Sequence, residues 1–373
     1  MILNGSNNFM NQNMKIPFVD LYPQYEELKS DIDSAIADII TRSDFITGPT
    51  VDKFERVISE YTGAEDCASI GSGTNALICA LKALGIGPDD EVLTVGHTFV
   101  STTESIVNVG AIPRFIDINE FYQMDTDQLV YSSRLKAILF VDLYGQTPDI
   151  DKILEFAKQW NLVVIEDAAQ SFGAEYKGKK VGNMVDLTCF SFNPVKNLGA
   201  MGDAGAVTGS KKLIDKVRMY RDHGRKTKFE YDTVGYNARI DNLQAVIVGT
   251  KLKKIDEWLD KKISICRKYT EQLNDVVKCP KEAPWSKHSY HLYVVETPHG
   301  TRDDLQEFLK QQGIQTNIHY KIPTHRTKAF YDGTKLPVTE RICENIISLP
   351  CYHTLMEHHQ DFIVKSIKEF YAD

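Results

Sequence analysis

Apolar segments of strand length alternate with amphipathic helical segments over the first two-thirds of this chain. Strands are predicted at residues 91–95, 114–118, 136–143, 162–166, 187–192 and 205–208. Helices are predicted between them at residues 74–84, 101–109 and 149–160. Near-continuous apolar strands that are joined by helices are typical of a mostly parallel sheet covered on both faces. The sequence therefore predicts an α/β fold.

The last third of the chain has a different pattern of predicted elements. Residues 241–274 form one long helical pattern rich in Lys and Glu, and residues 280–373 predict a smaller α/β unit with strands near 291–296 and 314–319. A chain of 373 residues exceeds the usual size of a single hydrophobic core. We expect a disordered extension over 1–14, a large α/β domain over 15–250, and a connector helix with a small C-terminal domain over 251–373.

Composition excludes several classes of protein. The net charge of −8 disfavours a nucleic-acid scaffold, and no apolar run approaches the roughly 20 residues of a membrane span. The seven cysteines are scattered without a CxxC pair, so they provide no zinc-site spacing and suit a reducing cytoplasm. The first residues lack the basic region and apolar core of a signal peptide. We expect a cytoplasmic protein with neither a metal site nor a nucleic-acid or membrane partner.

Two of the predicted strands are followed by residues whose side chains could take part in catalysis. The strand at 162–166 is followed by Asp167, and the strand at 187–192 delivers Ser191 and then Lys196. A carboxylate that protonates a pyridine nitrogen, a hydroxyl for a phosphate and a lysine for a Schiff base are the groups that pyridoxal phosphate needs. Taken alone, Asp167 could be a helix N-cap and Lys196 a solvated surface residue. The nearly uncharged, glycine-bearing segment 197–202 favours a desolvated Lys196 with a lowered pKa.

Four further residues suit the same cofactor. Gly73 and Thr74 open a predicted helix, whose free N–H groups and dipole attract a phosphate, although many helices begin with a Thr or Ser cap. Phe99 follows a predicted strand and is either a core residue or a flat ring that stacks on the pyridine. Gln170 lies in the same turn as Asp167, within reach of the phenolic oxygen of the cofactor.

These motifs together resemble the sugar aminotransferase family named for the DegT, DnrJ, EryC and StrS proteins, which have the aspartate aminotransferase fold (fold type I). The matching segments are residues 45–49, 71–77, 143–146, 166–171, 191–197, 235–239, 244–245, 319–320 and 348–350. They occur in order over nearly the whole chain from about residue 16, so the resemblance is highly specific.

The resemblance implies a role for each matching residue. Lys196 would be the Schiff-base lysine and proton shuttle, Asp167 the partner of the ring nitrogen, Gln170 that of the phenolic oxygen and Phe99 that of the ring face. Gly73, Thr74 and Ser191 would hold the phosphate of pyridoxal 5'-phosphate, and Asn237 would complete the phosphate site of the neighbouring subunit, so that the active unit is a homodimer. The implied substrate contacts are Arg239, whose planar fork suits an anionic group, and His319, Tyr320 and Asn193.

The family resemblance also implies the reaction. L-Glutamate would give its amino group to the cofactor, leaving 2-oxoglutarate and pyridoxamine 5'-phosphate, which then aminates a nucleotide-linked keto sugar. The segment Asn197–Asp203 reads NLGAMGD, a pattern associated with amination at C-3. A dTDP-3-keto-6-deoxyhexose is therefore favoured, within deoxysugar, polysaccharide or O-antigen biosynthesis. The alternatives are a UDP-linked 3-keto sugar, a C-4 aminotransferase and a non-catalytic regulator that only binds the cofactor. Dehydratase relatives replace the lysine by histidine, so Lys196 argues against a dehydratase.

Overall fold

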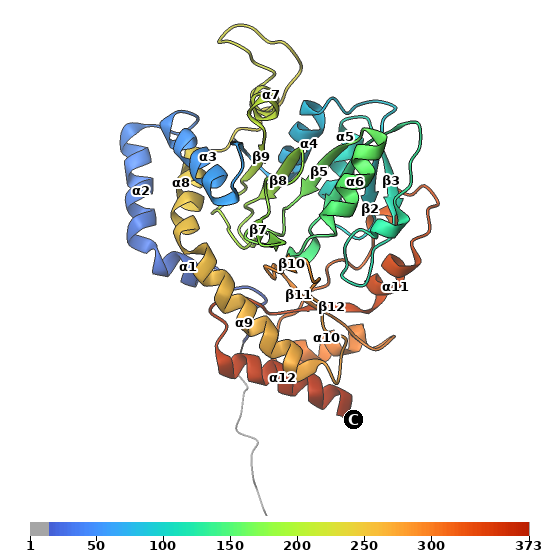
Figure 1. The fold of residues 1–373 in the computed structure, drawn as a ribbon. Coiled ribbons are helices and arrows are strands. Elements are labelled where there is room, and N and C mark those ends of the chain that lie inside the picture. The colour runs from blue at the N-terminus through green and yellow to red at the C-terminus, as the bar shows by residue number, and fades with distance from the viewer. Residues whose placement is uncertain (1–14, 373) are drawn as a thin grey trace, which may run out of the picture.

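A seven-stranded sheet forms the centre of the computed structural model, which describes residues 15–372 (Figure 1). In spatial order the strands are β1 (Asp66–Ile70), β9 (Gly205–Gly209), β8 (Leu187–Ser191), β5 (Val163–Asp167), β4 (Leu135–Val141), β2 (Glu91–Val95) and β3 (Ile112–Ile116). All neighbouring pairs are parallel except those of β9, which runs antiparallel to β1 and β8. The predicted mostly parallel α/β fold is confirmed. The predicted disordered extension over 1–14 lies outside the described residues.

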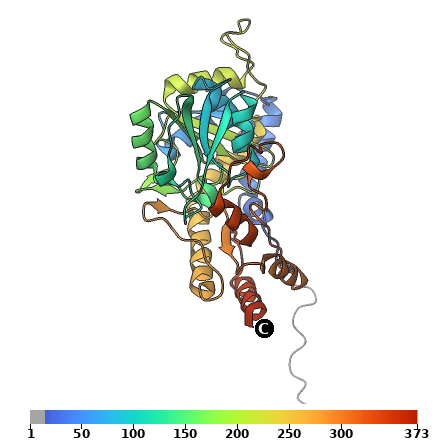
Figure 2. The same cartoon turned by 90° about the vertical axis from the view of Figure 1, so that its right-hand side faces the viewer.

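Helices cover both faces of this sheet (Figures 1 and 2). The helices are α1 (Tyr22–Glu27), α2 (Lys29–Arg42), α3 (Pro49–Thr62), α4 (Gly73–Ala83), α5 (Val100–Asn108), α6 (Ile150–Trp160), α7 (Lys211–Arg221), α8 (Asn242–Lys251), α9 (Ile255–Leu273), α10 (Arg302–Gln311), α11 (Pro337–Asn345) and α12 (Glu357–Ala372). In β4, Ala137 and Leu139 pack in the core under α4, α5 and α7, whereas Ile138 and Phe140 pack in the core under α6. Because both faces are buried, β4 reads as a continuous apolar run.

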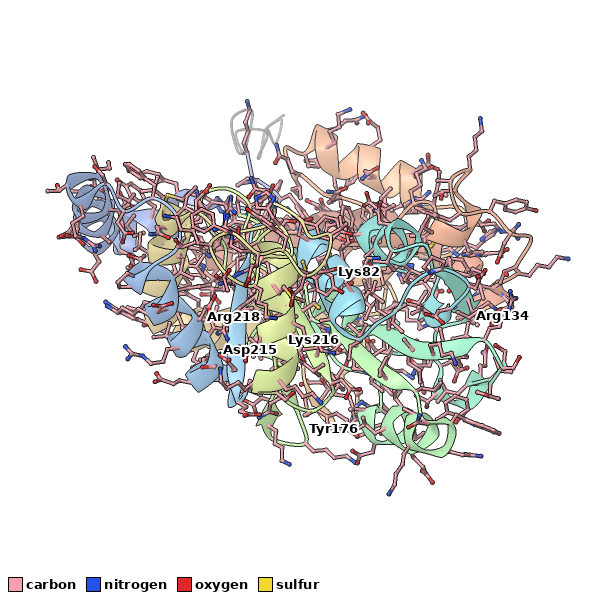
Figure 3. The ribbon with its side chains drawn as sticks, turned by 90° about the horizontal axis from the view of Figure 1, so that it is seen from above. Lys82, Arg134, Tyr176, Asp215, Lys216 and Arg218 are labelled. Carbon is pink, nitrogen blue, oxygen red and sulfur yellow. The ribbon has the colours of Figure 1, made fainter. Side chains whose placement is uncertain are left out.

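An ion-pair network fixes α7 to the edge of the sheet. Arg218 donates hydrogen bonds to Asp66 on β1 at 2.7 Å and to Glu55 on α3 at 2.9 Å. Figure 3 shows Arg218 beside Asp215 on the same helix. Burial by itself raises the pKa of the Glu55 carboxyl, but Arg221 and Arg218 outweigh it and hold this pKa below its ordinary value. The network keeps α3, β1 and α7 together at the side of the sheet where the chain enters it.

The predicted single helix over 241–274 is wrong. The chain forms α8 and α9 instead, separated by the 3₁₀ turn Leu252–Lys254. No Gly or Pro marks this break, and tertiary packing accounts for it. Helix α8 packs on α2 and α3, beside the seven-stranded sheet that forms the large lobe. Helix α9 leaves this lobe and runs into a second, small lobe (Figure 1). Lys251, at the end of α8, is held by the carbonyl oxygen of Gly199 at 2.8 Å.

The small lobe contains α9, α10 and α12 around a two-stranded antiparallel sheet of β11 (Tyr293–Glu296) and β12 (Ile346–Leu349). The predicted strand over 314–319 is wrong, because Ile314 and Asn317 make only isolated bridges, to Ile16 and to Ser348. Short strands complete the fold, namely β6 (Glu175–Tyr176), β7 (Lys179–Lys180) and β10 (Ser286–Lys287). Within residues 15–372, no helix has the length and apolar character needed to cross a membrane.

The packing of the central strand β5 can be tested by truncation. Ile165 is fully buried at the centre of β5, so Ile165→Ala should leave a cavity and lower the free energy of unfolding by about 3 kcal/mol. Val130→Ala is the control, because Val130 is 60% exposed. Denaturant unfolding of both variants measures the difference, and equal losses would contradict the placement of Ile165.

Candidate active site

Four loops meet at one edge of the sheet. The carboxyl ends of β1, β2, β5 and β8 lie at the same edge because these strands run in the same direction. The chain reaches Gly73, Phe99, Asp167 and Lys196 just as it leaves these four strands. All four residues line one cavity of about 420 Å³, in the position where open α/β sheets bind their ligands.

The same cavity gathers ten of the twelve residues that the sequence singled out. They are Gly73, Thr74, Phe99, Asp167, Gln170, Ser191, Asn193, Lys196, His319 and Tyr320. The last two come from the small lobe, so the cavity lies between the lobes. Asn237 and Arg239 are not in its lining, and Arg239 is instead paired with Asp222.

The N-terminus of α4 forms one corner of the cavity. Ser72 caps this helix by accepting the N–H of Asn75 at 3.2 Å, and Thr74 Oγ1 lies 2.7 Å from Ser101 Oγ. A Cβ atom at Gly73 would lie only 2.7 Å from Cβ of Ser191. Glycine therefore allows the helix to approach the end of β8, which brings the free N–H groups of α4 and the Ser191 hydroxyl to one place. Such a corner suits a phosphate.

Asp167 is a buried carboxylate that accepts few hydrogen bonds. The Thr102 hydroxyl donates to its Oδ2 at 2.7 Å, and the N–H of Ala169 donates to its Oδ1 at 3.2 Å. Burial raises the pKa of Asp167, and these two hydrogen bonds and the charge of Lys196 offset only part of this effect. A protonated ring nitrogen beside Asp167 would supply the missing positive partner.

Two more carboxyl groups lie buried next to Asp167. Glu166 accepts a hydrogen bond from the Thr188 hydroxyl at 2.7 Å, and Asp142 accepts one from the Ser171 hydroxyl at 2.7 Å. Burial raises the pKa of Glu166 to about 7, and burial together with Glu166 raises that of Asp142 well above its ordinary value. Neighbouring carboxyls with raised pKa values retain a proton near neutral pH, which limits the negative charge behind Asp167.

Lys196 is held on a tight loop after β8. Its backbone N–H donates to the carbonyl oxygen of Asn193 at 2.9 Å, and the Asn193 side chain donates to Asp203 at 3.0 Å. Burial lowers the pKa of Lys196 to about 8, against an opposing effect of Asp167. At neutral pH a larger fraction of this amine is uncharged than in an exposed lysine, which is the state that attacks a carbonyl carbon.

Aromatic and polar side chains form another part of the cavity wall. The ring of Phe99 is 52% exposed and its centroid lies 5.9 Å from that of Tyr320. Gln170 donates to the Tyr320 hydroxyl at 3.0 Å and accepts the backbone N–H of Tyr144 at 2.8 Å, so one amide hydrogen of Gln170 remains for a ligand. His319 Nδ1 lies 2.8 Å from Ser348 Oγ, and burial lowers the pKa of His319 to about 4.

Among the residues that sequence reasoning missed, Thr102 and His291 matter most for the chemistry of this site. Thr102 lies one helical turn after Phe99, is fully buried and contacts the site only through its hydrogen bond to Asp167. His291 lines the cavity from the chain just before β11, where it was read as the start of a strand. Burial lowers the pKa of His291 well below its ordinary value, and Lys196 and Lys262 add to this shift.

Comparison with known proteins identifies the family. The family model described as "DegT/DnrJ/EryC1/StrS aminotransferase family" matches residues 26–368. The chain belongs to this aminotransferase family. Within the described residues, no group of three or more His, Cys, Asp or Glu side chains is placed to hold a metal ion.

Three similar proteins span almost the full chain. A protein from Geobacillus stearothermophilus called "Pleiotropic regulatory protein" is 40% identical, with 96% of this chain and 99% of the relative covered. The "dTDP-3-amino-3,4,6-trideoxy-alpha-D-glucose transaminase" of Streptomyces venezuelae is 33% identical, with 95% and 96% covered. The crystal structure of ntda from Bacillus subtilis "with bound cofactor pmp" is 28% identical, with a TM-score of 0.91 and coverage of 98% of this chain and 87% of that one.

The lowered pKa of Lys196 can be measured directly in the cofactor-free protein. Labelling of Lys196 by an amine-selective acylating reagent should rise with pH and reach its midpoint near pH 8, because only the uncharged amine reacts. Lys29 is the internal control, since its hydrogen bond to Asp33 raises its pKa above 10.5. Peptide mass spectrometry gives both profiles in one experiment, and coincident midpoints would refute the assignment.

Proposed function

We propose that this protein is a pyridoxal 5'-phosphate-dependent aminotransferase that moves an amino group from L-glutamate to C-3 of a nucleotide-linked keto sugar. The observation that carries the proposal is one cavity lined by Lys196, by Asp167 and by the phosphate corner at Gly73 and Ser191. When bound, pyridoxal phosphate supplies an electron sink that allows an amino group to leave one substrate and join another. The described residues fit its phosphate, its ring nitrogen and its aldehyde.

Each group then has a defined task. Asp167 keeps a proton on the ring nitrogen, and Thr102 orients that carboxylate. Phe99 offers its exposed ring to one face of the pyridine. In the donor half-reaction the freed Lys196 amine would take a proton from the donor α-carbon and deliver it to the carbon that was the cofactor aldehyde. In the acceptor half-reaction it would carry a proton the opposite way, from that carbon to the keto carbon of the sugar. His319 and Tyr320 close the cavity from the small lobe and limit its access to water.

The sugar is a dTDP-3-keto-6-deoxyhexose in this proposal. The motif Asn197–Asp203 supports C-3, and the name of the Streptomyces relative supports a dTDP-linked 3-amino sugar. Asn193 lies in the cavity lining and would contact the hexose in this proposal. Such a product belongs to deoxysugar, polysaccharide or O-antigen biosynthesis. The seven cysteines are free thiols, in keeping with a cytoplasmic reaction.

The active unit is a homodimer in this proposal. The loop over 222–236, which follows α7, projects away from the body of the chain in both views (Figures 1 and 2). It carries the strongly exposed apolar side chains Phe229 and Val234. A second copy would cover this loop, and Asn237 at its end would reach the phosphate corner of that copy. The absence of Asn237 and Arg239 from the cavity lining of their own chain supports this arrangement.

A regulatory protein that binds the cofactor without turnover is the second candidate, because the Geobacillus relative is called a regulatory protein. Absorbance spectra separate the two. Addition of L-glutamate to the purified protein should bleach its visible cofactor band, and Lys196→Ala should lack both the original band and the response. The enzyme should then be assayed with a 3-keto and a 4-keto sugar, each linked to dTDP and to UDP. We expect an aminated product only from the dTDP-linked 3-keto sugar. A band that glutamate leaves unchanged would favour the regulator.

The phosphate corner provides a separate prediction. Gly73→Ala should weaken pyridoxal phosphate binding at least tenfold, because the new Cβ would lie 2.7 Å from Cβ of Ser191 and would separate the two sides of the corner. Gly87→Ala is the matched control, since its Cβ would meet nothing closer than 4.0 Å. Titration of the cofactor-free proteins followed by absorbance measures both affinities. Equal affinities in the two variants would argue against a phosphate at this corner.

A further inference from the structure

A second, smaller cavity of about 170 Å³ adjoins the cofactor cavity. The two cavities share four lining residues, Val195, Lys196, His291 and His319. The remaining walls come from the first described segment of the chain, from α9 and from the segment after β12. A ligand in the smaller cavity would therefore lie next to the reactive amine of Lys196 but outside the phosphate corner.

Lys262 on α9 is an unusual member of this wall. Its Nζ donates to Oδ1 of Asn197 at 3.0 Å and to the carbonyl oxygen of His291 at 3.0 Å, and both acceptors are uncharged. Within residues 15–372, no carboxylate pairs with it, and burial lowers its pKa. By contrast the adjacent Lys261 pairs with Glu257 at 2.8 Å. A partly buried ammonium group that meets only neutral acceptors gains from an anion nearby, and the cavity beside Lys262 has room for one.

Two ring nitrogens in the same lining also lack a partner. Nδ1 of His291 and Nε2 of His353 are buried and form no hydrogen bond with any described residue. Buried polar atoms in native proteins are nearly always paired, so unpaired ones call for a ligand or a water. The lining contains a single carboxylate, that of Asp20, which accepts the backbone N–H of Tyr22 at 3.2 Å. The lysine and histidine side chains of this lining therefore outnumber its one carboxylate.

The size of the cavity restricts the ligand. Sites for drug-sized ligands occupy roughly 300–1,000 Å³, so 170 Å³ is too small for a nucleotide sugar and suits a short organic acid. Trp258 and Leu259 add apolar surface to the wall, which suits a short methylene chain. A carboxylate at the end of such a chain would meet the ammonium group of Lys262.

We propose that this cavity binds the side-chain carboxylate of the amino donor, with Lys262 as its charged contact. The proposal rests on the aminotransferase function proposed above and deepens it, because it assigns the preference for a dicarboxylic donor to one residue. A charge-assisted hydrogen bond from the ammonium group, with His291 and His353 at hand as further partners, would hold the distal end of L-glutamate. Its α-amino group would then point toward Lys196. L-Alanine lacks this carboxylate and would gain nothing from Lys262.

The first test is the half-reaction with L-glutamate, followed by absorbance of the cofactor-loaded enzyme. Lys262→Met should raise KM for L-glutamate at least tenfold and change kcat less than twofold, and the rate measured with L-alanine should equal that of wild type. Lys262→Arg, which keeps the charge, should restore KM to within about threefold of wild type. Lys261→Met is the matched control and should behave as wild type, since this lysine is half-exposed and pairs with Glu257. An unchanged KM in Lys262→Met overturns the proposal.

A binding measurement separates this site from the proposed function. Calorimetry with glutarate, a dicarboxylate that cannot transfer an amino group, should show binding to the holoenzyme that weakens at least tenfold in Lys262→Met and not in Lys261→Met. Glutarate binding that ignores Lys262 overturns the donor site even if the enzyme uses L-glutamate. Lys262-dependent glutarate binding by a wild-type enzyme that leaves L-glutamate unreacted would support the anion site and reject the aminotransferase function.

Discussion

The burial of both faces of the parallel sheet is the constraint on which the rest of this structure depends. Parallel strands need a long crossover between them, and these crossovers supply the helices on either side. The same connectivity sends every loop after a parallel strand to one edge, so residues that are far apart in the sequence meet there. Lys196 and Asp167 come from neighbouring strands, whereas Gly73 reaches the same place because β9 inserts between β1 and β8. The strand order thus determines which residues meet at the site, and the side chains then determine its chemistry.

Burial also sets the electrostatics of that edge. The carboxyls of Asp142, Glu166 and Asp167 all lose hydration, and each has its pKa raised by burial. Only Asp167 accepts both a hydroxyl and a backbone N–H and lies near the charge of Lys196. The negative charge is therefore best stabilised on the carboxylate that faces the cavity. The desolvation that raises the pKa of these acids lowers that of Lys196 and so frees its amine.

Local patterns were enough to predict the strands of the central sheet that carry Asp167 and Lys196, and the residues directly after them. Asp167 and Lys196 follow apolar runs, and Gly73 precedes an amphipathic helix, so each was visible without knowledge of distant contacts. The break between α8 and α9 was not, because it depends on which lobe each half packs against. The pairing of β11 with β12 joins segments about fifty residues apart and left no local signal. His291 was missed for the same reason, since its neighbours Lys196 and Lys262 come from other parts of the chain.

Helix α9 has a consequence for the cooperativity of the whole chain. Its first turns, with Ile255 and Leu259, pack in the core of the large lobe, and its later turns, with Cys266 and Tyr269, pack in the core of the small lobe. A rigid helix of 19 residues, roughly 28 Å long, therefore belongs to two hydrophobic cores at once. Loss of either core removes half of the packing that stabilises this helix. We expect the two lobes to unfold as one cooperative unit, and neither lobe to fold when it is expressed alone.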